Sequence, residues 1–169
     1  MKITQATYWI ERLALTRPYT IAYEHIDSVL NLFVQLKADD GTVGLGVASP
    51  DQEVTGEGTQ MCRQALDDNL EVLLPGTDIR YLKTRLRDIE IAMPGAPAAR
   101  AAIDMALHDL WAKHLGLPLV DLLGRVHRSL PTSITIGINS VEESLEDAAE
   151  YMGRGFRILK VKIGRSVEE

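Results

Sequence analysis

A pair of lysines, Lys160 and Lys162, is the part of this sequence whose residue types and spacing most directly predict chemistry. They lie in the run RILKVKI at 157–163, whose β-branched and apolar residues predict a strand. Because side chains alternate along a strand, both lysines lie on one face and the apolar residues around them lie on the other. Mutual repulsion and partial burial favour the neutral form of a lysine, and a neutral lysine can take a proton from carbon. The segment therefore predicts proton transfer at a carbon atom.

The same two lysines also fit a simpler role, an amphipathic edge strand whose ammonium groups are solvated. The elements before the pair favour the chemical role. A β-branched run at 130–138 predicts another strand, and Ser140 and Glu143 have the spacing of a capping box that begins a helix at 141–153. Strand, helix and strand joined by short links form a βαβ unit, whose strands are parallel neighbours. In a β/α barrel the lysines would point inward near the mouth, where such folds place their chemistry.

The residues before position 125 predict a different arrangement, a small antiparallel sheet with helices. Asp39-Asp40-Gly41 predicts a tight hairpin turn, and an apolar stripe predicts a strong helix over 98–115 that ends at Gly116. We further expect a strand at 2–14, a loop at 15–27, strands at 28–38 and 42–48, a loop at 49–58, helices at 59–73 and 78–92, and a turn at 117–124. The expected fold class is α+β, a three-stranded antiparallel sheet plus helices over 1–125, followed by the first βαβ of a TIM-like barrel over 126–169.

Charge and composition exclude several classes of protein. The formal net charge is −6, and lysines and arginines are scattered along the sequence, so no nucleic acid is expected as a partner. Cys62 is the only cysteine, which excludes an intrachain disulfide and a cysteine metal cluster and fits a reducing cytoplasm. The sequence contains no signal-peptide core and no apolar run long enough to cross a membrane. We therefore expect a cytoplasmic protein without a membrane partner.

Several segments resemble a known superfamily. The run AIDMALHDL at 102–110, with LPL at 117–119 and LLG at 122–124, resembles the last helix and turn of the capping domain in the mandelate racemase and muconate lactonising group of the enolase superfamily. The run TSITIG at 132–137 resembles the first barrel strand of that group, and GFRILKVKIG at 155–164 resembles the second, with its Lys-x-Lys signature. The resemblance covers essentially the whole chain. Within the group, these segments are most similar to dipeptide epimerases of the Ala-Glu type.

This resemblance implies roles for the residues. Lys162 would be one acid/base at the α-carbon of a carboxylate substrate, Lys160 would assist it electrostatically, and Thr135 would contribute to substrate binding. A second lysine and the Asp and Glu ligands of Mg²⁺ would lie on later strands, beyond Glu169. The residues present here would therefore hold no metal, and this part alone would be inactive. The complete enzyme would be a homo-oligomeric racemase or epimerase acting on a small molecule, with dipeptides as the expected substrates.

The resemblance also implies two loops that close over the barrel mouth, exclude water and select the substrate. The first corresponds to 16–27 and the second to 49–58. Their substrate-binding candidates are Tyr19, Ile21, Tyr23 and Glu24 in the first loop and Val54 in the second.

The charge of the first loop affects which dipeptides the enzyme is expected to prefer. Ala-Glu epimerases are expected to place a cation there, but no Lys or Arg occurs between Pro18 and Asn31, where Glu24 and Asp27 are acidic. An acidic loop repels a second carboxylate and attracts a cation. We therefore expect a preference for dipeptides with a basic or apolar C-terminal residue over Ala-Glu, unless barrel loops set the specificity.

Other interpretations remain open. Muconate cycloisomerase and o-succinylbenzoate synthase share the Lys-x-Lys strand, and a non-catalytic capping module is an alternative from a different class. Asp104 and His108 lie four residues apart on the helix at 98–115, so both project from one side. A packing role is favoured for this pair, because a third metal ligand at suitable spacing is missing.

Overall fold

A computed structural model of the chain describes residues 1–20 and 25–163. The chain divides into two compact units. The first unit is formed by Met1–Leu13 with Leu30–Arg125, and the second by Ala14–Val29 with Val126–Glu169. Two long strands, β1 (Ile3–Thr20) and β2 (His25–Ala38), contribute residues to both units.

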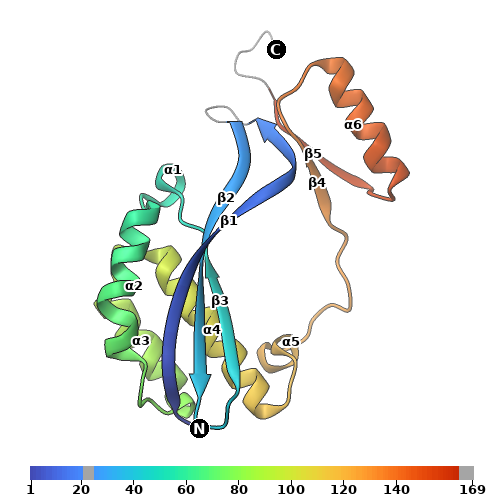
Figure 1. The fold of residues 1–169 in the computed structure, drawn as a ribbon. Coiled ribbons are helices and arrows are strands. Elements are labelled where there is room, and N and C mark those ends of the chain that lie inside the picture. The colour runs from blue at the N-terminus through green and yellow to red at the C-terminus, as the bar shows by residue number, and fades with distance from the viewer. Residues whose placement is uncertain (21–24, 164–169) are drawn as a thin grey trace. The chain divides into compact units, whose positions relative to one another are not determined.

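The first unit contains a three-stranded sheet in the order β1-β2-β3, where β3 is Val43–Ala48 (Figure 1). Strands β2 and β3 are antiparallel, with Leu36 opposite Gly44. The hairpin turn between them is confirmed: Gly41 has a φ of +85°, which favours glycine, and its amide donates to the carbonyl of Ala38 at 3.0 Å. The Asp-Gly signal therefore fixes this turn, as the sequence predicted.

Helices cover one face of this sheet (Figure 1). In chain order, the helices of the first unit are α1 (Gln52–Thr55), α2 (Thr59–Leu73), the short 3₁₀ helix η1 (Ile79–Tyr81), α3 (Leu82–Ala92), α4 (Pro97–Leu115) and α5 (Leu119–Leu123). The apolar stripe of α4 is buried as its spacing predicts. Gly116, with a φ of +66°, ends α4, and its amide donates to the carbonyl of Lys113 at 3.1 Å.

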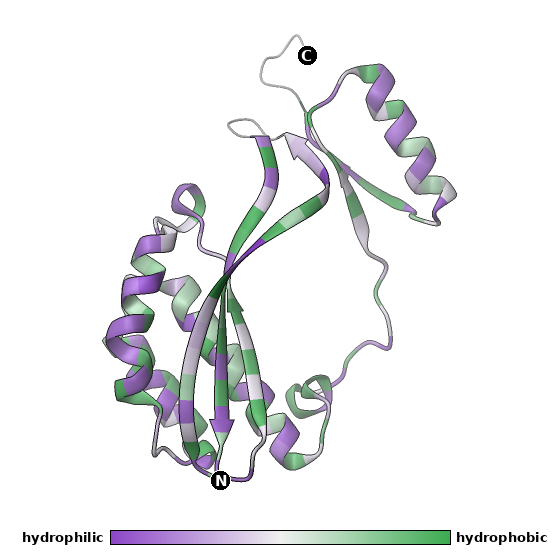
Figure 2. Ribbon diagram, viewed as in Figure 1, coloured by the Kyte–Doolittle hydropathy of each residue, from purple (hydrophilic) through white to green (hydrophobic). Residues whose placement is uncertain are grey.

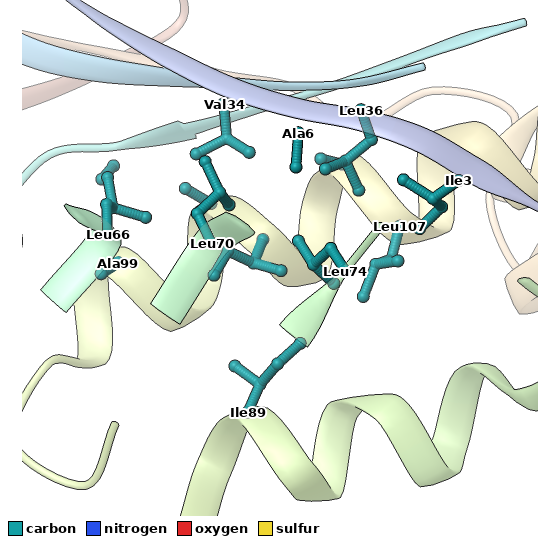
Figure 3. Packing of buried hydrophobic residues seen from close by; sticks show 14 of the residues in the cluster. Ile3, Ala6, Val34, Leu36, Leu66, Leu70, Leu74, Ile89, Ala99 and Leu107 are labelled. Atoms are coloured by element: carbon teal, nitrogen blue, oxygen red, sulfur yellow. The ribbon is translucent and has the colours of Figure 1, made fainter. Parts of the chain in front are cut away.

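The core of the first unit lies between the sheet and these helices. Figure 3 shows side chains of β1 and β2 pointing toward Leu66, Leu70 and Leu74. Leu36 of β2 and Leu66 of α2 are both fully buried. Burying such apolar side chains is the dominant stabilising term, on the order of 2 kcal/mol for each large aliphatic residue.

The backbone of strand β3 approaches the backbone of α4 closely at Gly44 and Gly46. A Cβ atom at Gly44 would overlap the carbonyl oxygen of Ala106, and one at Gly46 would overlap that of Ala102. Both obstacles are backbone atoms of a helix, which cannot rotate away. These two glycines therefore set the distance between the sheet and α4.

The second unit contains β4 (Ser133–Ile136), α6 (Val141–Gly153) and β5 (Ile158–Val161). The two strands pair in parallel, which confirms the βαβ unit (Figure 1). The capping box is also confirmed, since Glu143 N–H donates to the Ser140 hydroxyl at 3.2 Å and Ser140 N–H donates to Oε2 of Glu143 at 3.0 Å. The bond from Ser140 N–H, together with one from the Ser140 hydroxyl to the same oxygen at 3.0 Å, lowers the pKa of the Glu143 carboxyl.

The prediction of a loop at 15–27 was wrong for most of its length. β1 continues to Thr20 and β2 begins at His25, so extended backbone occupies 15–20 and 25–27. One hydrogen bond that stabilises this extension comes from far along the chain: Ile138 N–H donates to the carbonyl of Thr20 at 3.1 Å. Local patterns could not predict it, because the partner lies outside the segment.

Smaller differences have local causes. The segment at 49–58, expected to be a loop, includes α1, and 117–124 includes the short helix α5. The helix expected from position 78 begins instead with η1. Asp78 caps that turn by accepting from Arg80 N–H at 3.0 Å, while the Thr77 hydroxyl donates backward to Leu74 at 2.6 Å.

Candidate functional site

The parallel pairing of β4 and β5 places three predicted site residues on one face. Thr135 lies opposite Lys160 in the register, and paired residues share a face of the sheet. Lys162 N–H donates to the carbonyl of Ile136 at 3.0 Å, so the pairing extends past the end of β5. Lys162 follows Lys160 by two positions and therefore lies on the same face. Thr135 and Lys160 are exposed, whereas Lys162 is half-buried.

The opposite face of this strand pair is apolar and faces α6. A groove of about 760 Å³ separates the strands from the helix, and Lys162 borders it. Its apolar lining comes from Ile136, Ile138, Leu159, Val161 and Ile163 on the strand side and from Val141, Leu145 and Ala148 on α6. In Figure 2 the ribbons of β4 and β5 include hydrophobic residues, and the ribbon of α6 contains both hydrophilic and hydrophobic ones. Thr135 and Lys160 consequently lie on the face opposite this apolar lining, while Lys162, on their face by alternation, also borders the groove.

Tyr19 lies near the carboxyl end of β4. It belongs to β1, not to a loop, and is 37% exposed. A Cβ built on Gly137 would lie 3.3 Å from the Cβ of Tyr19 and 3.3 Å from the backbone nitrogen and oxygen of Thr20. Gly137 thus leaves room for the strand that carries Tyr19, and the second unit brings this candidate to the end of the strand that carries Thr135.

The other candidates lie outside the second unit or outside the described residues. Val54 lies in α1 of the first unit and is 72% exposed. Ile21, Tyr23 and Glu24 lie outside the described residues. Their proposed contact with substrate therefore remains a prediction from the sequence.

Glu57 is a residue that the sequence analysis missed. It is fully buried, and its carboxylate accepts hydrogen bonds from Ala98 N–H at 2.5 Å and Ala99 N–H at 3.2 Å. These amides belong to the first turn of α4, which has no side-chain cap of its own because Ala96 precedes Pro97. Glu57 supplies the missing cap from outside the helix and places its negative charge at the positive end of the helix dipole. The absence of a capping residue before Pro97 was the signal that could have revealed it.

The contact of Glu57 with α4 also fixes the position of the segment that carries Val54. Asp51 caps α1 by accepting from Glu53 N–H at 2.9 Å, and Gly56 ends the helix with a φ of +74°. Glu57 follows directly and anchors the segment to α4. Cys62 lies close by, and burial, with a smaller contribution from Glu57, raises the pKa of its thiol to about 12.

Neither a metal centre nor a membrane span is found in the described part of the chain. Residues 1–20 and 25–163 contain no cluster of three or more His, Cys, Asp or Glu side chains that could hold a metal ion. His108 Nδ1 lies 3.0 Å from the carbonyl oxygen of Asp104 and 2.5 Å from its Oδ1, so this pair is engaged locally within α4. Among the described helices, none is long and apolar enough to cross a membrane.

Comparison with known sequences identifies relatives over the whole chain. Residues 3–124 match the N-terminal domain of the mandelate racemase / muconate lactonizing enzyme family. The chain is 57% identical, over 169 residues, to an L-Lys-D/L-Arg epimerase of Desulforapulum autotrophicum, covering 100% of this chain and 48% of that protein. It is 35% identical, over 151 residues, to the L-Ala-D/L-Glu epimerase of Bacillus subtilis, covering 89% of this chain and 41% of that protein. The chain spans about half the length of these curated relatives.

Solved structures of dipeptide epimerases are also similar to this chain. A dipeptide epimerase from Methylococcus capsulatus, crystallised with Mg and the dipeptide L-Arg-D-Lys, is 52% identical and superimposes with a TM-score of 0.95. The match covers 99% of this chain and 48% of that chain. The substrate-liganded L-Ala-D/L-Glu epimerase of Bacillus subtilis is 34% identical, with a TM-score of 0.92 over 98% of this chain and 46% of the other. The α+β architecture followed by a parallel strand pair is thus shared with these enzymes.

Proposed function

Because this chain belongs to the mandelate racemase / muconate lactonizing enzyme family, we propose that it forms the N-terminal part of a dipeptide epimerase. Such an isomerase removes the α-proton of one residue of a dipeptide and returns a proton to the same carbon. The observation that carries the proposal is the shared face of Thr135, Lys160 and Lys162 on the parallel strand pair. In β/α barrels, side chains at this end of the strands perform the chemistry.

Lys162 takes the central role in this proposal. Its half-buried position restricts access of water, and its neutral amine accepts the α-proton, which becomes part of the ammonium group. Lys160 lies two positions earlier on the same face and assists it electrostatically. The proton that completes the epimerisation comes from a second acid/base in the part of the family fold that this chain does not span.

Magnesium belongs to the same proposal. A relative of this chain was crystallised with Mg and a dipeptide. When bound, such a cation stabilises the negative charge that develops on the substrate carboxylate. The described residues do not supply a ligand cluster for it. We assign its ligands to the part of the family fold outside this chain.

For the substrate, we propose dipeptides that carry a cationic side chain. Two relatives at 57% and 53% identity are L-Lys-D/L-Arg epimerases, whereas the L-Ala-D/L-Glu epimerases are 35% identical or less. The sequence between Pro18 and Asn31 agrees with this choice, since it contains Glu24 and Asp27 and no Lys or Arg. Carboxylates that face a substrate attract an ammonium or guanidinium group and repel a second carboxylate.

The test measures exchange of the α-proton in D₂O by ¹H NMR, with the full-length protein, Mg²⁺ and a panel of dipeptides. We expect faster exchange and higher kcat/KM for Lys- or Arg-containing dipeptides than for Ala-Glu. Lys162→Ala should reduce kcat by at least about 10³-fold while the fold is retained, and the matched variant Lys83→Ala, at an exposed lysine of α3, should stay within twofold. Near-normal turnover by Lys162→Ala would overturn the role of Lys162.

A charge reversal tests the substrate separately. Glu24→Arg should lower kcat/KM for cationic dipeptides and raise it for Ala-Glu. Higher wild-type efficiency on Ala-Glu, or no change on reversal, would show that the first loop does not select the side chain. Epimerisation would then stand, and only the substrate preference would be lost.

For the whole protein, we propose a cytoplasmic location and a homo-oligomeric state. The free, buried thiol of Cys62 agrees with a reducing compartment. Light scattering on the full-length protein tests the oligomer, and a monomer at micromolar concentration would contradict it.

A further inference from the structure

The ends of β1 and β2 form an arm, residues 14–20 and 25–29, that groups with the second unit. From the sequence alone, this region is expected to be a loop of the capping domain. In the second unit, it lies against β4 and α6 through side-chain and backbone contacts. The contacts that hold the arm there also determine the position of Tyr19, a substrate-binding candidate on the arm.

Arg17 makes the principal side-chain contacts of the arm. Its Nη1 donates to Oδ1 of Asp147 at 3.0 Å and to the hydroxyl of Tyr151 at 2.8 Å. Its Nη2 donates to Oε2 of Glu150 at 2.7 Å. Asp147, Glu150 and Tyr151 are spaced at three and four residues along α6, which places them side by side on one face. One guanidinium group thus binds three acceptors of a single helix turn.

The acceptors are themselves held in place. Asn139 donates to the second carboxylate oxygen of Asp147 at 3.1 Å. Tyr151 is only 5% exposed, and the guanidinium carbons of Arg17 and Arg154 lie 5.3 and 5.6 Å from its ring centroid. Cation–π contact and the hydrogen bond to its hydroxyl therefore act on the same ring.

This cluster differs from an ordinary surface ion pair. Arg17 and Glu150 are nearly half exposed, and a single pair of that kind contributes little because water and salt screen it. Here one planar guanidinium group binds the carboxylates of Asp147 and Glu150 and the hydroxyl of Tyr151. It also lies over the ring of that buried tyrosine. A lysine, which offers a single point charge, cannot reproduce that geometry.

The backbone of the arm continues from this anchor to the carboxyl end of β4. Three residues after Arg17, the carbonyl of Thr20 accepts from Ile138 N–H at 3.1 Å. Tyr19 and Thr20 pass close to Gly137, which follows the last residue of β4. The Arg17 contacts and the Thr20 hydrogen bond thus fix two points of the arm, one on each side of Tyr19.

We propose that Arg17 is a positioning residue for the epimerase: it fastens the arm to α6 and thereby sets the place of Tyr19 at the carboxyl end of β4, the strand that carries Thr135. This inference rests on the proposed function. Arg17 does not touch the reacting atoms in it. Its effect is on where the substrate-binding arm lies relative to the strands that carry Thr135 and the lysines.

Kinetics and hydrogen exchange on the full-length protein test the proposal together. Arg17→Ala should raise KM for a Lys- or Arg-containing dipeptide about tenfold while kcat stays within about threefold, because binding is impaired and the proton carriers remain. Arg17→Lys should restore less than half of the lost affinity. Arg157→Ala, at an exposed arginine of the same unit, is the matched control and should leave KM within twofold.

Hydrogen–deuterium exchange supplies a readout that does not depend on turnover. The peptide that contains Ile138 should exchange at least fivefold faster in Arg17→Ala than in the wild type or Arg157→Ala. Exchange unchanged in Arg17→Ala would overturn the anchoring role. Faster exchange with an unchanged KM would overturn the positioning role and leave a structural one.

The outcomes also separate this proposal from the proposed function. A wild-type protein that exchanges no dipeptide α-proton would overturn the epimerase function and, with it, the role of Arg17 in substrate binding. The exchange of the Ile138 peptide would still decide whether Arg17 holds the arm. Thermal unfolding by circular dichroism identifies a variant that fails to fold, and in that case Arg17→Lys replaces Arg17→Ala in both measurements.

Discussion

The two units of this chain are stabilised by different interactions. In the first unit, apolar side chains of the sheet and of α2, α3 and α4 meet in a closed core, and Leu36 and Leu66 are fully buried. In the second unit, Ile136 and Tyr151 are the buried large side chains among the described residues, while Leu145 is 66% exposed. Polar contacts such as those of Arg17 contribute a larger share of the stability of this unit.

This difference separates the unit that provides most of the packed core from the unit that carries the candidate catalytic lysines. The first unit uses close packing, which tolerates little change in volume. The second unit carries the lysine face and holds its arm with hydrogen bonds and charges, which respond to pH and to single side-chain changes. Substitutions in the first unit should therefore change the free energy of unfolding, whereas those in the second unit should change substrate binding.

The largest effect is expected from Gly46→Ala. The added Cβ would overlap the carbonyl oxygen of Ala102, and the strand would have to move away from α4. We expect the free energy of unfolding of the first unit to fall by about 3 kcal/mol or more. Denaturant titration followed by tryptophan fluorescence measures it, because Trp9 and Trp111 both lie in this unit.

Gly95→Ala is the matched control for that variant. No atom lies within 4 Å of the position where its Cβ would be, and its φ is not positive. We expect a change within about 0.5 kcal/mol. Equal stability of the Gly46 and Gly95 variants would contradict the view that close backbone packing limits the first unit.

A smaller loss is expected from Glu57→Ala. The substitution leaves Ala98 N–H and Ala99 N–H of α4 without their acceptor in a buried position. We expect a loss of about 2 kcal/mol in the free energy of unfolding, because each buried amide loses a charged partner. Glu53→Ala, at an exposed glutamate of α1, should change stability by less than about 0.5 kcal/mol. Similar midpoints for both variants would argue against a capping role for Glu57.

The smallest effect concerns pH and the second unit. The hydrogen bond from Arg17 lowers the pKa of Glu150, so the folded protein binds this proton less tightly than the unfolded chain does. The stabilising contribution is therefore complete above the ordinary glutamate value of about 4.3 and is lost as the pH falls through the lowered folded value. We expect the Ile138 peptide to lose protection at acidic pH, after correction for the intrinsic exchange rate.

Glu150→Gln provides the comparison for the pH experiment. Its amide cannot titrate, so the acid-dependent part of the change at Ile138 should become smaller than in the wild type. The same acid dependence in both proteins would assign the effect to another group. Peptides from the core of the first unit, such as those around Leu66, should keep their protection over the same range.

Much of the fold could be predicted because its signals are local. Asp40-Gly41 specifies the hairpin turn, Ser140 and Glu143 specify the start of α6, and Gly116 specifies the end of α4. Each rests on hydrogen bonds or backbone angles within a few residues. The Lys-x-Lys pattern likewise fixed a shared face for Lys160 and Lys162, since alternation along a strand depends only on sequence spacing.

The missed features depend on partners far along the chain. Glu57 caps a helix that begins 40 residues later, at Pro97, and Arg17 binds acceptors on α6 that lie 130 to 134 residues away. The extension of β1 to Thr20 depends on the distant amide of Ile138. No local pattern predicts such contacts, because an exposed arginine or a glutamate in a loop looks the same with or without a partner.

By itself, the sequence determined the identities and faces of the chemical groups: turn geometry, helix ends and strand alternation follow from steric and hydrogen-bonding rules that act between neighbouring residues. The tertiary structure alone decided which distant groups meet: Glu57 with α4, Gly46 with Ala102, and Arg17 with α6. These meetings depend on packing and on the closure of long chain segments, whose free energy is set by the whole fold and not by any one segment.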